Sequence, residues 1–225
     1  AHEIENGGGW FGRSYFGNGA TNNYFINCSS SGNLSPGITG SGAIVGAYAG
    51  LGGQLYITGC SSSGIIEQND GGIVGGFAGG NGGSVICEQC WSTGIIESRG
   101  GGIFGYYAGD DGTVEAIKCY STGNIGIESG GIFGPYAGNF GQALAEKCYT
   151  TGNIGANGGG IFSKGAGSNS GSSSAINCYS AGTIDTPGNG IYGYEKVNGT
   201  EINCYAANNN WNNDTANLSL LGVPS

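Results

Sequence analysis

One cysteine recurs through this chain at nearly constant spacing, and that repeat constrains the fold more than any other feature. Successive members of the column are 26 to 32 residues apart. The column comprises Cys28, Cys60, Cys90, Cys119, Cys148, Cys178 and Cys204. A unit this short cannot bury an apolar face by itself, so its copies must stack and share a continuous core.

A second column lies in short apolar segments bounded by glycine, of which "GGIFG" is typical. Its members are Trp10, Ile44, Ile73, Ile103, Ile132, Ile161 and Ile191, and the residues after them are Phe11, Val45, Val74, Phe104, Phe133, Phe162 and Tyr192. These segments are too short for helices and are rich in β-branched and aromatic residues, so they predict strands. In stacked parallel strands about 4.8 Å apart, like residues form columns, and glycine allows turns and close approach between coils.

Composition narrows the choice of architecture. Of 225 residues, 52 are glycine, yet 38% are hydrophobic, which argues against collagen and against disorder. Thirty-residue units are too short for propeller blades, and the glycine content excludes an α-solenoid. We therefore predict an all-β, right-handed parallel β-helix (β-solenoid) of about seven coils of about 30 residues, covering residues 1–205.

One segment resembles a known repeat family. "GGIFGYYAGDDGTVEAIKCYSTGNIG", residues 101–126, is similar to the GLUG repeat of large bacterial surface proteins, which include adhesins and IgA-peptidase-like chains. Similar Cys-Tyr-Ser-Thr-Gly repeats occur in predicted proteins of giant DNA viruses. The resemblance covers residues 7–205 and weakens in the last copy. It implies a parallel β-helix with a surface or adhesive role and brings no catalytic residues.

The cysteine column has two interpretations, a row of reactive or metal-binding thiols or a small apolar residue that fits one interior position. Zinc sites use closely spaced pairs of ligands, which this column lacks. Parallel side chains in stacked coils also hold their Cβ atoms too far apart for ordinary disulfides. We predict a buried ladder with no metal or other cofactor. Cys87, three residues before Cys90, is expected on the opposite strand face.

Catalytic candidates are few. Glu67 and Glu97 occupy equivalent positions in successive coils, and Asp70 lies between two coils. Asp110 and Asp111 share a turn, and the single histidine, His2, is near the terminus. Glycosidic cleavage needs carboxyl groups that converge on one cleft. We expect no enzymatic activity, and a polysaccharide-degrading β-helix enzyme remains an alternative.

Two aromatic columns form the predicted interaction face. Residues that follow the cysteines are Trp91, Tyr120, Tyr149, Tyr179 and Tyr205, and residues of the glycine-rich turn are Tyr48, Phe77, Tyr107 and Tyr136. Such ladders can contact sugars or another protein, or stabilise their own sheet. A carbohydrate-binding module is therefore an alternative function. Ice binding is another, although only one threonine column persists, at Thr93, Thr122 and Thr151.

The ends of a solenoid expose strand edges, which monomers normally cover. Residues 206–225 leave the repeat and are predicted to form a cap or an inter-subunit tail. Predicted end contacts are Trp10, Phe11, Trp211, Leu218, Leu220 and Leu221. The expected partners are a head-to-tail copy of the chain or neighbouring structural proteins, with glycans as the alternative.

With a net charge of −9 and scattered bases, nucleic-acid binding is not expected, and no apolar run is long enough for membrane insertion. The predicted function is a structural or adhesive solenoid of a cell surface, an extracellular filament or a virion.

Overall fold

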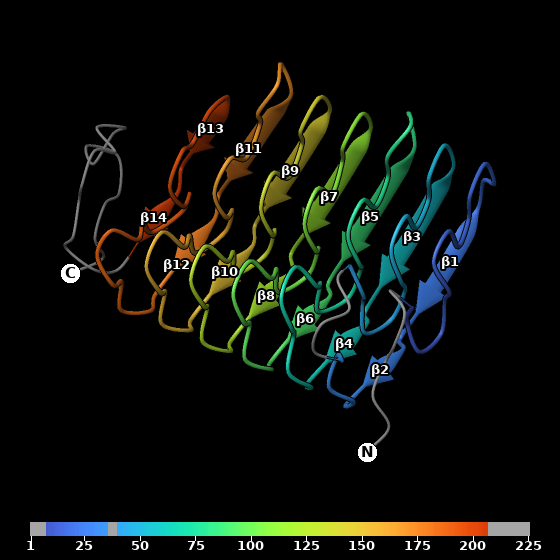
Figure 1. The fold of residues 1–225 in the computed structure, drawn as a ribbon, viewed down its shortest axis with the longest axis horizontal. Helices are drawn as coiled ribbons and strands as arrows, with labels where there is room; N and C mark the ends of the chain where they lie inside the picture. Colours follow the sequence, from blue (N-terminus) through green and yellow to red (C-terminus); the bar gives the residue numbers. More distant parts are fainter. Residues whose placement is uncertain (1–7, 36–39, 207–225) are drawn as a thin grey trace.

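The computed structural model describes residues 8–35 and 40–206 and is an all-β parallel β-helix (Figure 1). Its first sheet holds β1 (Asn23–Ile26), β3 (Gln54–Thr58), β5 (Ser84–Glu88), β7 (Thr113–Ile117), β9 (Gln142–Glu146), β11 (Ser172–Ile176) and β13 (Gly199–Ile202). Its second sheet holds β2 (Ser29–Ser30), β4 (Ser61–Ser62), β6 (Trp91–Ser92), β8 (Tyr120–Ser121), β10 (Tyr149–Thr150), β12 (Tyr179–Ser180) and β14 (Tyr205–Ala206). All neighbours pair in parallel and in register, which confirms the predicted fold.

Further parallel bridges complete each coil outside the named strands. One series joins Ile66, Ile96, Ile125, Ile154 and Ile184, and another joins Val45, Val74, Phe104, Phe133, Phe162 and Tyr192. Seven strands in each sheet correspond to about six complete right-handed turns. Like residues therefore lie over one another on every side of the coil, as the sequence predicts.

The corner before each cysteine is made by a residue in the left-handed region, and in most coils it is not glycine. Gly59 has φ 64°, but Gln89, Lys118, Lys147 and Asn177 have φ between 53° and 55°. Glycine instead makes the turn before the first sheet, where Gly50, Gly79, Gly109 and Gly138 have φ between 66° and 76°, as the sequence predicts. The corner before Cys90 overturns the prediction for Cys87, because the bend at Gln89 turns Cys87 and Cys90 to the same side, and both are fully buried.

Glycine is required elsewhere because of close backbone approach. A Cβ on Gly101 would overlap the carbonyl oxygen of Phe104 in its own coil. A Cβ on Gly123 would overlap the carbonyl oxygen of Gly94 in the preceding coil. The glycines at the positions of Gly101 and Gly123 thus record places where the backbones approach too closely for a side chain, although the last coil has Asn189 at the position of Gly101.

The first coil departs from the predicted register by one residue. Gly12, not Phe11, pairs with Val45, and the amides of Phe11 and Gly12 both donate to the Ile44 carbonyl. The Trp10–Ile44 and Phe11–Val45 alignment is therefore wrong. The reason is packing, because a Cβ on Gly12 already approaches the Phe25 ring at 3.0 Å, which leaves no room for a larger side chain.

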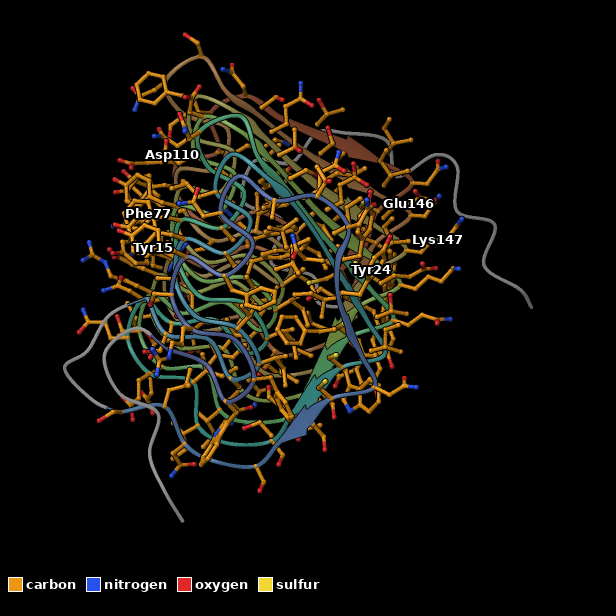
Figure 2. All side chains as sticks on the ribbon, turned by 90° about the vertical axis from the view of Figure 1, so that its right-hand side faces the viewer. Tyr15, Tyr24, Phe77, Asp110, Glu146 and Lys147 are labelled. Carbon is orange, nitrogen blue, oxygen red and sulfur yellow. The ribbon has the colours of Figure 1, made fainter. Side chains whose placement is uncertain are left out.

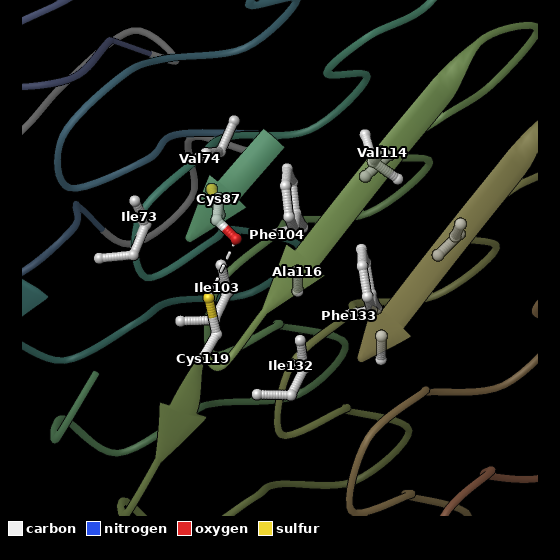
Figure 3. Close-up of a cluster of buried hydrophobic side chains, with 14 of the residues drawn as sticks. Ile73, Val74, Cys87, Ile103, Phe104, Val114, Ala116, Cys119, Ile132 and Phe133 are labelled. Atoms are coloured by element: carbon white, nitrogen blue, oxygen red, sulfur yellow. Dashed lines mark hydrogen bonds between the residues drawn. The ribbon is translucent and has the colours of Figure 1, made fainter. Parts of the chain in front are cut away.

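Two facing columns of the core change size in opposite directions (Figure 3). Going from the second coil to the last, one column grows through Val45, Val74, Phe104, Phe133, Phe162 and Tyr192. The facing column on the first sheet shrinks through Leu55, Val85, Val114, Ala143, Ser173 and Gly199. A Cβ on Gly199 would lie 2.9 Å from the Tyr192 ring, so the columns touch. The larger side chains therefore move from the first sheet to the opposite side of the core along the solenoid.

Candidate functional site

The most continuous surface feature is a stack of five aromatic rings in the turns before the first sheet. Neighbouring centroids are 4.7, 4.9, 5.3 and 4.9 Å apart, with interplanar angles of 3° to 22°. The members of this turn ladder are Tyr15, Tyr48, Phe77, Tyr107 and Tyr136. Tyr15 was not predicted as a member. Its signal was present, since "RSYFGNG" copies the position of "GAYAGLG" in the next repeat.

All five ladder residues have φ between 52° and 62°. Bulky side chains rarely adopt this left-handed conformation. Stacking on both sides holds them there, since each interior ring lies between two others. The pKa of Tyr48 is raised by partial burial and by the neighbouring Tyr15. The same conformation occurs at Gly165, the next position of the column, where a Cβ would strike the Tyr136 ring.

Polar groups flank the turn ladder on both sides. On one side, the Asn139 amide donates to the Asp110 carboxylate at 2.7 Å, and Ser168 donates to Asn139 at 3.0 Å. On the other, Glu128 accepts from Arg99 at 2.9 Å and from Lys164 at 2.7 Å. These two cations lower the pKa of Glu128, Lys164 contributing most. These contacts join coils to one another and so reinforce the stack.

The second aromatic ladder lies on the second sheet. Trp91 stacks on Tyr120 at 5.9 Å, and Tyr120 on Tyr149 at 4.8 Å. Tyr179 stacks on Tyr205 at 5.5 Å. We call these residues the strand ladder. As predicted, its side chains point outward, and the three C-terminal members are 38% to 39% exposed.

The two ladders lie on different segments of each coil, the turn before the first sheet and the second sheet. Figure 2 looks at the solenoid from its N-terminal end and places Tyr15 and Phe77 on the side opposite Tyr24, Glu146 and Lys147. Tyr149 of the strand ladder lies on the second sheet, two residues after the corner at Lys147. Where rings stack in either ladder their faces cover one another, so these rings offer their edges and, for the tyrosines, their hydroxyl groups.

The cysteine ladder lies inside the solenoid. Cys60, Cys90, Cys119, Cys148 and Cys178 are buried, while Cys28 and Cys204 in the end coils are partly exposed. All eight cysteines are free thiols. Each ladder thiol donates to backbone carbonyls, as Cys119 does to Cys87 at 3.3 Å. Burial raises the pKa of Cys87 and of Cys148. The predicted role as a small interior residue is thus confirmed by burial.

Beside the cysteine ladder runs an interior column of hydroxyl groups that sequence reasoning missed. Its members are Ser62, Ser92, Ser121, Thr150 and Ser180, all buried. Thr150 donates to Ser180 at 3.4 Å. The column packs against the second glycine of the Gly-Gly pair, because a Cβ on Gly102 would lie 2.9 Å from Ser121. The sequence signal was the serine two residues after most of the cysteines. Side chains alternate between the two faces of a strand, so a residue two positions after an inward cysteine also points inward.

The acidic candidates are dispersed. Glu67 and Glu97 lie in adjacent coils, and the Glu97 amide donates to the Ile66 carbonyl. Asp70 is fully buried, and one of its oxygens accepts the Ser41 amide at 2.7 Å while the other has no partner. Burial raises the Asp70 pKa to about 8, and Glu67 adds to the rise. Within residues 8–35 and 40–206, no group of three or more His, Cys, Asp or Glu is arranged to hold a metal ion.

The predicted end contacts lie partly within the described residues. Trp10 and Phe11 are 46% and 51% exposed. Trp211, Leu218, Leu220 and Leu221 lie outside the described residues, as does His2. At the C-terminal end, Glu201 occupies the inward column of Ala175 and pairs with Lys196 at 2.7 Å. The Lys196 ammonium lies 4.8 Å from the centre of the Tyr192 ring.

Comparisons with known proteins give one structural match. No protein-family model matches the chain, and no curated protein is similar to it. A crystal structure from Bacteroides ovatus, provisionally assigned as an immunoglobulin A1 protease, aligns with a TM-score of 0.46 and 22% sequence identity. The alignment covers 81% of this chain and 57% of that structure. A likeness at this level indicates nothing about activity or ligands, and the GLUG-repeat resemblance rests on the sequence alone.

A long apolar helix of the kind that crosses a bilayer does not occur in the part of the chain that the structure describes.

Proposed function

We propose that this chain is a non-enzymatic structural or adhesive β-solenoid of a cell surface, an extracellular filament or a virion. The observation that carries the proposal is the continuity of contacts along the axis. Backbone pairing joins the coils on several sides, and aromatic and polar ladders join them outside. Such a stack resists bending and presents repeated side chains over its whole length.

The distribution of carboxyl groups supports a non-catalytic role. Acid–base cleavage needs two groups with different environments close to one substrate bond. Burial gives Asp70 a raised pKa, but the side chain is inaccessible to a substrate and one of its oxygens accepts a hydrogen bond from the Ser41 amide. The Asp110 carboxylate accepts a hydrogen bond from the Asn139 side-chain amide.

Ring geometry weighs against the carbohydrate-binding alternative. A sugar stacks on the face of an aromatic ring. In the strand ladder, Trp91, Tyr120 and Tyr149 stack on one another at 4.8 to 5.9 Å and Tyr179 stacks on Tyr205 at 5.5 Å, so these rings cover one another's faces. The ladders are better suited to stabilising their own coils and to lateral contact through ring edges and hydroxyl groups. We therefore favour adhesion to a protein or cell surface over binding of a single glycan chain.

The test is an adhesion assay combined with a cleavage assay. Beads coated with the full chain are passed over cell monolayers, matrix proteins and immobilised polysaccharides, and the same materials are assayed for released sugars and peptides. We expect retention of the beads without cleavage, and reduced retention for the Tyr120→Ala, Tyr149→Ala double variant with its fold intact. Catalytic release of products would overturn the proposal, as would failure of the beads to adhere to any surface.

A further inference from the structure

The N-terminal end of the solenoid is an apolar, unpaired edge. Among residues 8–35 and 40–206, β1 pairs only with β3, and β2 pairs only with β4. An edge strand presents unused backbone donors and acceptors. Five large hydrophobic side chains of this first coil are 46% to 62% exposed: Trp10, Phe11, Tyr15, Tyr24 and Ile26. Strand edge and apolar surface therefore coincide at this end.

The core also reaches the surface at this end. Phe16 and Phe25 point inward with ring centroids 4.8 Å apart, yet both remain partly exposed. In the next coil the same two columns hold Ala49 and Ile57, which are fully buried. Ile57 is covered because a coil lies on each side of it. Phe25 has the same environment on one side only, so a second apolar surface would bury it further.

Charge distinguishes this end from the other. Residues 8–35 contain one charged side chain, Arg13. The last coil carries Glu195, Lys196 and Glu201, and Glu201 points inward. Inward-pointing charge on an edge strand discourages further strand pairing. A head-to-tail contact would also press the Lys196–Glu201 pair against the aromatic end, which removes charged groups from water without a new partner.

We propose that two copies of this chain pack through their N-terminal coils around a two-fold axis and form a closed dimer. A two-fold axis across the end reverses the chain direction of the second copy, so the two β1 edges meet as antiparallel strands. The contact uses the same patch on both copies and cannot propagate. It differs from the head-to-tail filament expected from the sequence, and it does not depend on the proposed adhesive role.

The test compares two matched variants at opposite ends of one surface column. Ile26 on β1 and Ile202 on β13 occupy that column and are 62% and 46% exposed. Light scattering after gel filtration, over a dilution series of the full chain, should give twice the chain mass of 22.4 kDa. Ile26→Lys should weaken the dimer by about tenfold or more, because it places like charges at the edge. Ile202→Lys should leave the dimer intact.

Hydrogen exchange of the unmodified chain provides a second measurement that needs no variant. Amides of β1 should exchange more slowly at high protein concentration than at low concentration, while amides of β13 should not change. A monomer at every concentration would overturn the proposal. So would particles that keep growing with concentration, or a dimer that Ile202→Lys breaks and Ile26→Lys does not.

Discussion

The two halves of the core solve the same packing problem with different residues. In the second coil, Val45 faces Leu55 and Ile57, so the first sheet supplies most of the volume. In the sixth coil, Phe162 faces Ser173 and Ala175, so the opposite side supplies it. All but Ser173 belong to one continuous cluster of buried hydrophobic residues. The repeat therefore fixes which positions face the core and not the residue at each position.

The largest expected effect comes from removing a large ring in the C-terminal half. Phe133 is fully buried and stacks on Phe104 at 5.0 Å and on Phe162 at 4.7 Å. Phe133→Ala should lower the free energy of unfolding by about 3–5 kcal/mol, because the small residues Ala143 and Ala145 opposite it cannot fill the cavity. Val45→Ala, facing larger residues, should cost clearly less. Denaturant titration measures both, and equal losses would contradict the idea of two differently built halves.

A buried acid provides a second contrast between the halves. Asp70 and Ser129 occupy equivalent positions, and Ser129 is satisfied because its hydroxyl donates to the Glu97 carbonyl at 2.6 Å and accepts the Gly100 amide at 3.2 Å. Asp70 instead keeps one oxygen without a partner. Burial raises its pKa in the folded state to about 8, well above the value of 3.8 for a free side chain.

The folded state therefore holds a proton that the unfolded state releases. Stability is fully present below the unfolded pKa and is lost as the pH rises toward 8, at about 1.4 kcal/mol per pH unit. We expect the free energy of unfolding to fall by about 3 kcal/mol between pH 5 and pH 7 from this group. Asp70→Asn should remove that dependence, whereas the exposed Asp185→Asn should keep it. A wild-type protein of constant stability over this range would refute the account.

Compensation between facing columns can be tested by moving residues of one half into the other. Ala145→Ile gives the fifth coil the isoleucine that the second coil has at the equivalent position, Ile57. Because this isoleucine would lie opposite Phe133, it should overpack the core, at a cost of about 1–3 kcal/mol. Adding Phe133→Val should recover part of that cost, since the pair then matches Val45 and Ile57. A double-mutant cycle should give a favourable coupling of about 0.5–3 kcal/mol. Additive losses would show that the columns do not compensate.

The fold was predictable because its signals are local and repeated. The cysteine column and the Gly-Gly-Ile segments recur often enough to fix coil length and strand pairing. Gly101 and Gly123 show why, since their close backbone contacts exclude a side chain and recur at the equivalent glycines of neighbouring coils, such as Gly130 and Gly152. Outward placement of the strand ladder followed from alternation along the strand.

What could not be predicted depends on contacts between columns. The register of the first coil follows from Phe25, whose ring lies against Gly12 and leaves no room there for a side chain as large as that of Val45, the equivalent residue of the second coil. No pattern within "GGGWFG" reveals this. Cys87 turns inward because Gln89 adopts a conformation usually left to glycine. The placement of the turn ladder opposite Tyr24 and Glu146 of the first sheet likewise required the shape of the whole coil.

The smallest expected effect concerns the turn ladder, which occupies the first five coils and ends at Gly165. Tyr107 combines favourable stacking, at 5.3 Å on Phe77 and 4.9 Å on Tyr136, with an unfavourable φ of 52°. Tyr107→Ala removes the stacking, worth about 0.5–1.5 kcal/mol per ring pair, and keeps the backbone strain. Tyr107→Gly removes both, and relief of the left-handed strain is worth about 1–2 kcal/mol, offset in part by the greater freedom of glycine in the unfolded chain.

We therefore expect Tyr107→Gly to be more stable than Tyr107→Ala by up to about 1 kcal/mol, the reverse of the usual order for these residues. Thermal unfolding of the two variants measures the difference. Gly165→Ala is the matched control, because it adds a side chain in the same conformation against the Tyr136 ring and should destabilise the coil. If alanine proved better than glycine at position 107, the ladder would not be holding strained residues, and stacking alone would account for its presence in the N-terminal coils.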